Sequence, residues 1–192
     1  MTGALPARIR TSWNNFVGPD ATVLDNTVTL TLAALGAPAA PSVTHAAGPL
    51  PSGQRVVLRL LATDLWGGAW ANNTRACARW YERPGQTDSD HIAFAAMHVH
   101  PAVLAWMDRG YPPHRVHPTV WAGAHYGYLM AATYSIRRRP DRRRLLGVGL
   151  TVGGVALDLT LGPSRVAPWF APVYYVKLLL GHASAALSPV SA

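Results

Sequence analysis

Apolar stretches of membrane-spanning length alternate along this chain with short charged or Pro/Gly-rich connectors. A helix that crosses a bilayer needs about 20 mostly apolar residues, within a range of about 17–25. The pattern predicts an all-α fold, a polytopic transmembrane bundle of about six spans in a single domain of residues 1–192. The expected spans are roughly 21–40, 56–74, 91–108, 116–136, 145–162 and 166–188.

The six stretches differ in how strongly they predict a span. Residues 116–136 contain no Asp, Glu, Lys or Arg, whereas 145–162 contain only Asp158 and 166–188 only Lys177. The stretch 21–40 is the weakest, because its NTVTLTLAAL alternates polar and apolar residues as a β-strand does. We expect a helix there, since an open strand would leave backbone groups unpaired in lipid. Without it, five spans remain.

The alternative is a soluble helical domain. A mean hydropathy of only +0.11 and the polar residues within several stretches favour it. However, a soluble amphipathic helix carries charged residues along one face, and neither 92–107 nor 116–136 has such a face. Only 14% of the residues are charged, against about 25% in typical soluble domains. These observations favour the membrane bundle.

The net charge of +8 raises the question of nucleic-acid binding. Six of the seventeen basic residues lie in the single run RRRPDRRR (137–144), and no basic helix with interleaved aromatics follows, which argues against it. With six spans, eleven basic connector residues fall on one side of the bilayer and four on the other. The positive-inside rule then predicts both termini in the cytoplasm and the lipid bilayer of the cell membrane as the main partner. The abundance of Arg, Ala, Gly and Pro is typical of a bacterial, GC-rich coding sequence.

Ionisable residues inside the spans are the candidates for chemistry. Each costs at least about 2.5–3.5 kcal/mol on insertion, so it faces the bundle interior and pairs with another group. Lys177 is the only lysine, and Asp158, one span earlier, is its expected partner in an ion pair or relay. Asp64 has no local partner, so we expect it to meet a histidine from another helix.

The stretch AMHVHP (96–101) places two histidines two residues apart. Successive residues of an α-helix turn by about 100°, so the rings of His98 and His100 should point to nearly opposite sides. Pro101 should kink the helix. We therefore expect His98 to face inward and to join Asp64 and His125 as candidate catalytic residues.

His98, His125 and His182 could together bind a metal, because zinc takes three such ligands and a water at catalytic sites. Haem would need only two histidines on facing helices. The sequence has no HExxH, HxxxH or CxxCH motif, so zinc and haem both stay open and the cofactor is unknown.

Two groups of small residues predict close helix packing. Gly123 and Gly127 form a GxxxG pair, and Gly147, Thr151 and Gly154 share a helix face with Asp158. Such Gly-rich faces could also bind a second copy or a membrane partner.

Three functions agree with these features. The first is a membrane enzyme that uses His and Asp, around a metal, on a lipid-like or small apolar substrate. The second is a proton- or ion-coupled small carrier. The third is a structural or partner-binding subunit without catalysis. No P-loop, GxSxG or dinucleotide motif selects among them.

Overall fold

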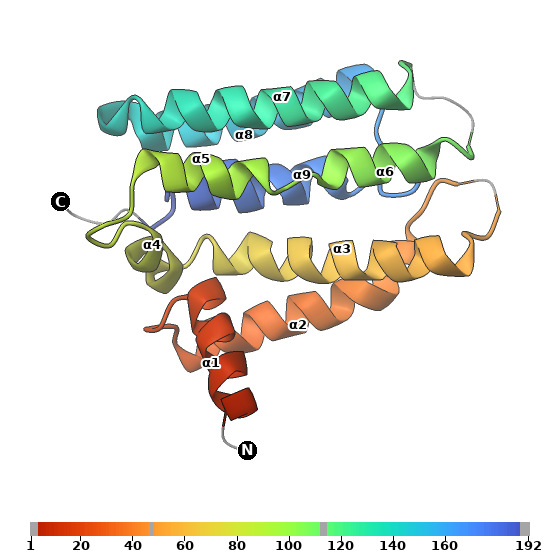
Figure 1. Cartoon of the computed structure of the whole chain (residues 1–192). Coiled ribbons are helices and arrows are strands. Elements are labelled where there is room, and N and C mark those ends of the chain that lie inside the picture. Colours follow the sequence, from red (N-terminus) through yellow and green to blue (C-terminus); the bar gives the residue numbers. More distant parts are fainter. Residues whose placement is uncertain (1–3, 47, 112–114, 189–192) are drawn as a thin grey trace.

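All the regular structure that the computed structural model describes is helical, which confirms the all-α class. The described residues are 4–46, 48–111 and 115–188. Six rods run side by side along one axis: α2, α3, α5 followed by α6, α7, α8, and α9 followed by η3 (Figure 1). The elements are α1 Ala4–Val17, α2 Val23–Ala39, η1 Ala40–Ser42, α3 Ser52–Ala71, α4 Arg75–Tyr81, α5 Asp88–Ala96, α6 His100–Asp108, α7 Pro118–Arg137, η2 Pro140–Arg142, α8 Arg143–Leu161, α9 Phe170–Tyr175 and the π-helix η3 Val176–Ala183.

α2 is a helix in spite of its strand-like alternation. It begins at a capping box, in which the hydroxyl of Thr22 accepts from the amide of Asp25 and the carboxylate of Asp25 accepts from the amide of Thr22. This arrangement satisfies amides that would otherwise have no partner at the helix start. α2 packs closely on α3, because a Cβ at Gly36 would lie 2.9 Å from the ring of Trp66.

The segment around the two histidines is a break between helices. α5 ends with Met97 as its C-cap, and α6 starts at His100 with Pro101 in its first turn. Proline has no N–H to donate, so the first turn of a helix tolerates it well. The expectation of one kinked helix is wrong here, because Pro101 begins a new helix instead of bending an existing one.

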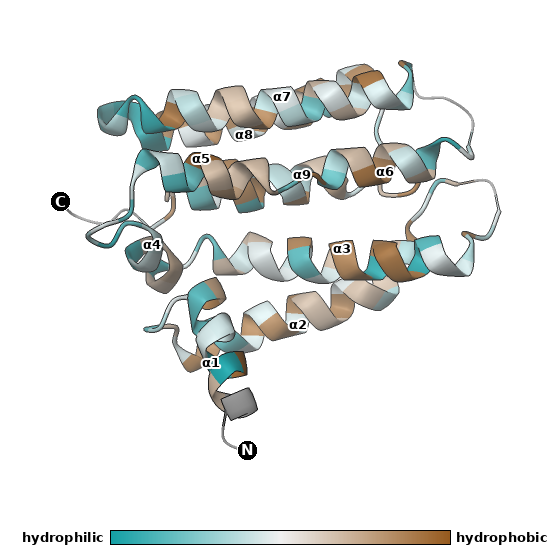
Figure 2. Cartoon of the chain, viewed as in Figure 1, coloured by the Kyte–Doolittle hydropathy of each residue, from teal (hydrophilic) through white to brown (hydrophobic). Residues whose placement is uncertain are grey.

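Large apolar side chains lie on both the inside and the outside of the bundle. The core includes Leu58 and Leu65 of α3, Trp121 and Leu129 of α7, and Tyr174 of α9, all fully buried. Other large apolar side chains are exposed along α2, α3, α7 and α8: Val23, Leu24, Leu30, Leu35, Val56, Leu60, Val120, Leu145, Val148, Val152 and Leu159. Hydrophilic residues gather at the end of the bundle near α4 and the end of α7 (Figure 2).

One helical stretch of the described residues, Pro140–Leu161, is long and apolar enough to cross a membrane by length and hydropathy. A buried helix of a soluble protein passes the same test, but only 22% of the apolar window of this stretch is buried. The polytopic bundle therefore stays a prediction.

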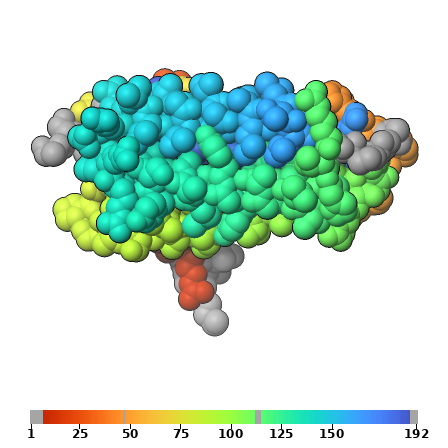
Figure 3. All heavy atoms as spheres, turned by 90° about the horizontal axis from the view of Figure 1, so that it is seen from above, coloured from red at the N-terminus to blue at the C-terminus, as the bar shows by residue number. Residues whose placement is uncertain are grey.

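α1 lies across the direction of the six rods and projects from the molecule when it is seen from above (Figures 1 and 3). It is attached at the α4 end: Tyr81 donates to the carbonyl of Asn15 at 3.2 Å, and Trp13 donates to the side chain of Asn26 at 2.6 Å. The exposed side chains of α1 include Arg8, Ile9 and Arg10, which are basic and apolar.

Candidate functional site

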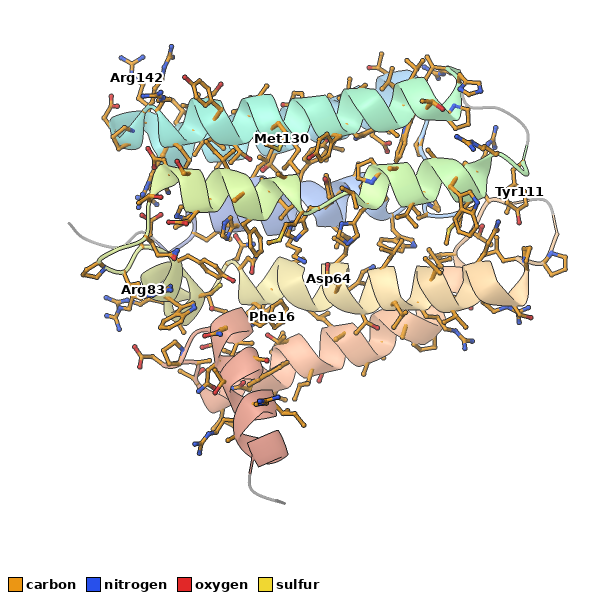
Figure 4. All side chains as sticks on the ribbon, in the orientation of Figure 1. Phe16, Asp64, Arg83, Tyr111, Met130 and Arg142 are labelled. Atoms are coloured by element: carbon orange, nitrogen blue, oxygen red, sulfur yellow. The ribbon has the colours of Figure 1, made fainter. Side chains whose placement is uncertain are left out.

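Asp64 and Lys177 form an ion pair between α3 and η3. The ammonium Nζ of Lys177 donates to Oδ2 of Asp64 at 2.6 Å. The Lys177 side chain is only 1% exposed, whereas that of Asp64 is 42% exposed. Asp64 lies near the middle of α3, on the side that faces the α5–α6 break (Figure 4). The pair therefore joins a buried cation to a carboxylate that reaches the surface of the bundle.

His100 is the third member of this cluster. Its Nε2 lies 3.2 Å from Oδ2 of Asp64, and its Nδ1 is buried without a hydrogen-bond partner. The carboxylate favours a proton on Nε2 and leaves Nδ1 as the basic nitrogen. The sequence correctly predicted that Asp64 would meet a histidine from another helix.

The expected geometry of the two histidines is wrong. The rings of His98 and His100 lie stacked, 5.4 Å apart at an angle of 23°, and do not point to opposite sides. The 100° rule applies only within one continuous helix, and the chain breaks between these residues. His98 is buried, as expected, but its Nδ1 lies 2.7 Å from the carbonyl of Phe94, which is a local contact.

Gly68 of α3 and two asparagines just after the end of α3 hold Lys177 beside Asp64. A Cβ at Gly68 would lie 2.6 Å from Cε of Lys177, so a larger residue there would force the end of this side chain to shift. Asn72 and Asn73 donate to the backbone carbonyls of Lys177 and Val176 at 3.2 and 3.0 Å. π-Helical turns occur frequently at functional sites, and here the turn carries the lysine. The face shared by Asp64, Gly68 and Asn72 thus packs on η3.

Asp158 belongs to a second cluster, so the expected Asp158–Lys177 pair is wrong. Oδ1 of Asp158 accepts from the indole of Trp121 at 3.2 Å and lies 3.2 Å from Nε2 of His125. Nδ1 of His125 lies 2.7 Å from the hydroxyl of Tyr175. Because His125 and Asp158 are buried and contact polar partners, this cluster mainly ties α7, α8 and α9 together.

The small residues that share a face with Asp158 provide the predicted close packing. A Cβ at Gly154 would lie 2.5 Å from the ring of Tyr175, and the hydroxyl of Thr151 donates to the carbonyl of Tyr175. The predicted contact at Gly123 and Gly127 is absent among the described residues. Nothing lies within 4 Å of a Cβ built at either glycine, and both are exposed on the outer face of α7.

His182 lies in a third group at the α4 end of the bundle. Its ring contacts those of Tyr81, His91 and Phe94 at centroid distances of 4.6, 4.7 and 3.8 Å. Neither ring nitrogen of His182 has a hydrogen-bond partner within the described part of the chain.

Glu82 lies between this group and the arginine run. Its Oε1 lies 2.7 Å from Nη1 of Arg137, and its Oε2 lies 3.1 Å from Nη1 of Arg143. Burial alone would raise the pKa of Glu82, but the hydrogen bond and charge of Arg137, with the charge of Arg143, hold that pKa below its ordinary value.

The three histidines proposed as metal ligands thus belong to three different groups: His98 with His100, His125 with Asp158, and His182 with His91. Within residues 4–46, 48–111 and 115–188, no group of three or more His, Cys, Asp or Glu side chains is arranged to hold a metal ion. A zinc site built from His98, His125 and His182 is therefore not supported by the positions of these side chains.

Comparison with protein-family models, with curated proteins and with solved structures finds no match to this chain. The function must therefore be argued from the side chains.

The cluster of Asp64, His100 and Lys177 has the parts of an acid–base site. The half-exposed carboxylate can accept or release a proton at the surface, the buried ammonium balances its charge, and the imidazole can exchange a proton with it. The sequence indicated Asp64 and Lys177 but not His100. Only the helix break, which has no clear sequence signal, brings His100 to the cluster.

Proposed function

We propose that this chain is a multi-pass membrane protein in which Asp64, His100 and Lys177 form an acid–base site for a lipid-like, amphipathic molecule. The exposed apolar side chains along α2, α3, α7 and α8 support membrane insertion, because they would contact hydrocarbon rather than water. The charged residues of the connectors gather at the ends of the rods, as expected for helices that cross a bilayer.

The observation that carries the proposal is the exposure of Asp64 at 42% of its side chain, midway along α3. Leu60, one turn earlier on the same face of α3, is apolar and 65% exposed. A charged group on an apolar surface fits a ligand that has both a polar group and a hydrocarbon part. Its partners, the buried Lys177 and the mostly buried His100, orient the carboxylate.

In this proposal Asp64 is the catalytic residue that touches the substrate, as general base or acid. Lys177 is a positioning residue that stabilises the carboxylate. His100 passes a proton to or from Oδ2 through Nε2, 3.2 Å away. General acid–base catalysis by such groups contributes about 10²–10⁴-fold to a reaction rate.

The test compares purified wild-type protein with Asp64→Asn and with Asp158→Asn, incubated with lipids of the native membrane and analysed by mass spectrometry. Asp158→Asn is the control for loss of a buried carboxylate outside the site. We expect a lipid species to change over time with wild type and Asp158→Asn but not with Asp64→Asn. If folded wild-type protein changes no species relative to Asp64→Asn, the proposed enzyme is wrong. Proton flux into liposomes that depends on Asp64 would then favour the carrier.

A further inference from the structure

A row of histidines runs through the bundle from Glu82 to Asp64. Nε2 of His91 lies 3.8 Å from Oε1 of Glu82, and the His91 and His182 rings are 4.7 Å apart. The ring of Phe94 stacks on His182 at 3.8 Å and contacts His98 at 4.6 Å.

The row continues across the break between α5 and α6. The rings of His98 and His100 are stacked 5.4 Å apart, and Nε2 of His100 lies 3.2 Å from Oδ2 of Asp64. His91 lies on α5 and His98 follows the end of that helix, and the ring of His182 of η3 contacts the rings of His91 and Phe94. The row therefore links the arginine-rich end of the molecule to the middle of α3.

Several nitrogen atoms of this row have no protein partner although they are buried. Among the described residues these are both ring nitrogens of His182, Nδ1 of His91 and Nδ1 of His100. A buried polar group without a partner costs about 1–3 kcal/mol, so water commonly satisfies such groups. His182 also lines a small cavity of about 10 Å³ with Tyr81, Glu82 and Cys77, which is room for about one water molecule.

We propose that this histidine row is hydrated and conducts protons between the Glu82 end and the Asp64 cluster, an inference that rests on the proposed function. A proton from bulk water at the arginine-rich end protonates His91 and passes through water at His182 to His98. Nδ1 of His100 then takes up the proton while Nε2 releases its own proton to Asp64. The bulk water loses one proton and the Asp64 cluster gains one; release follows the reverse order.

Positively charged side chains lie at both ends of the row. Arg137 and Arg143 face Glu82 at the entrance, and Lys177 faces Asp64 at the inner end. Phe94 lies between His182 and His98, so the proton crosses there through water at the ring edge. Such a route is needed because Asp64 opens onto an apolar surface, where a bilayer supplies no water.

Hydrogen–deuterium exchange at the histidine rings tests the proposal. In D₂O the carbon-bound hydrogen on Cε1 of each histidine is replaced by deuterium, and this exchange requires water at the ring. The protein is used in liposomes and each histidine is measured by mass spectrometry. His125 is the control, since it is also buried and its Nδ1 and Nε2 lie 2.7 and 3.2 Å from the side-chain oxygens of Tyr175 and Asp158. We expect His182 to exchange about tenfold faster than His125, as a locally hydrated group would. Equal protection of both rings would overturn the proposal.

A His182→Phe variant tests the continuity of the row. Its larger apolar ring should exclude the water and slow the exchange of His98, while exposed His117 at the other end of the bundle stays unchanged. Unaltered exchange at His98 would show that the row is not a route. If lipid conversion fails while His182 exchanges rapidly, the proposed function is wrong but the hydrated row stands. If conversion occurs and His182 is protected, the route alone is wrong.

Discussion

The Asp64–Lys177 pair is unequal in its surroundings, and this sets what each partner contributes. Lys177 is 1% exposed, and Asp64 is the only carboxylate found in contact with its ammonium among the described residues. Asp64 reaches the surface and keeps His100 as a second partner. Removing one partner of a buried pair is costly when the remaining charge stays buried and uncompensated.

We therefore expect Asp64→Asn to destabilise the fold by about 3 kcal/mol, because it leaves the buried ammonium without a counter-ion. Lys177→Met should cost less, about 1 kcal/mol, since Asp64 retains His100 as a partner. The double variant should be more stable than Asp64→Asn alone. Unfolding of the detergent-purified variants, followed by tryptophan fluorescence, measures the difference. A greater loss in Lys177→Met than in Asp64→Asn would contradict this account.

Glu82 should make the α4 end sensitive to acid. Its pKa is lower in the folded protein than in the unfolded chain, so its contacts with Arg137 and Arg143 contribute fully above the unfolded pKa of about 4.5. This contribution is lost as the pH falls through the lowered folded pKa. Wild-type protein should lose stability on acidification below pH 4.5. Glu82→Gln should show a flatter profile over the same range, and thermal unfolding at a series of pH values tests this. Parallel profiles would mean that the bridge does not stabilise the fold.

At the residue scale, the sequence predicted which residues need interior partners but not which partners they meet. Asp64 and Lys177 stand out because isolated charges in apolar stretches are costly. We paired Lys177 with Asp158 because the two are near each other along the chain, but Asp158 contacts Trp121 and His125 instead. Nearness in sequence does not fix which faces of non-adjacent helices meet.

At the scale of single elements, α8 contains one glycine that close packing requires and another that it does not. Gly154 faces the rigid, buried ring of Tyr175, while nothing lies within 4 Å of a Cβ at exposed Gly149. Both glycines lie in the same helix, so their intrinsic helix propensities are alike.

Gly154→Ala should therefore destabilise the protein by about 1–3 kcal/mol through overpacking. Gly149→Ala should be neutral, or stabilising by about 0.5–1 kcal/mol, since alanine favours the helix. The two midpoints of denaturation, measured side by side, give the difference. Equal midpoints would show that α8 and α9 are not in close contact at Gly154.

The long helices α2, α3, α7 and α8 could be located from the sequence because apolar runs mark them, whereas α1 and α4 lie outside the expected spans. The break at His98–His100 could not be predicted, since Pro101 fits both a kinked helix and the first turn of a new one. The π-helix that carries Lys177 and His182 also lacks a sequence signal. These two irregular elements determine the composition of the candidate site.

For the whole molecule, the distribution of polarity is the main argument. Charged and histidine side chains such as Lys177, His125 and His182 are buried, whereas large apolar side chains such as Leu60 and Val152 are exposed. In water this arrangement would expose apolar surface without compensation, and in lipid the same surface is favourable. Among the described residues, length and composition identify only Pro140–Leu161 as a candidate span.

The most direct test of this account is the depth of the exposed apolar faces in a bilayer. Spin labels are attached to cysteines at Leu60 of α3 and Val152 of α8, which are 65% and 64% exposed, in a Cys77→Ser background reconstituted in liposomes. A label at Arg142, in the arginine run, is the control. The account predicts that both helix labels collide with lipid-soluble oxygen and hardly with a water-soluble nickel complex, while the control shows the reverse. Strong collisions with nickel at Leu60 and Val152 would contradict a membrane-spanning bundle.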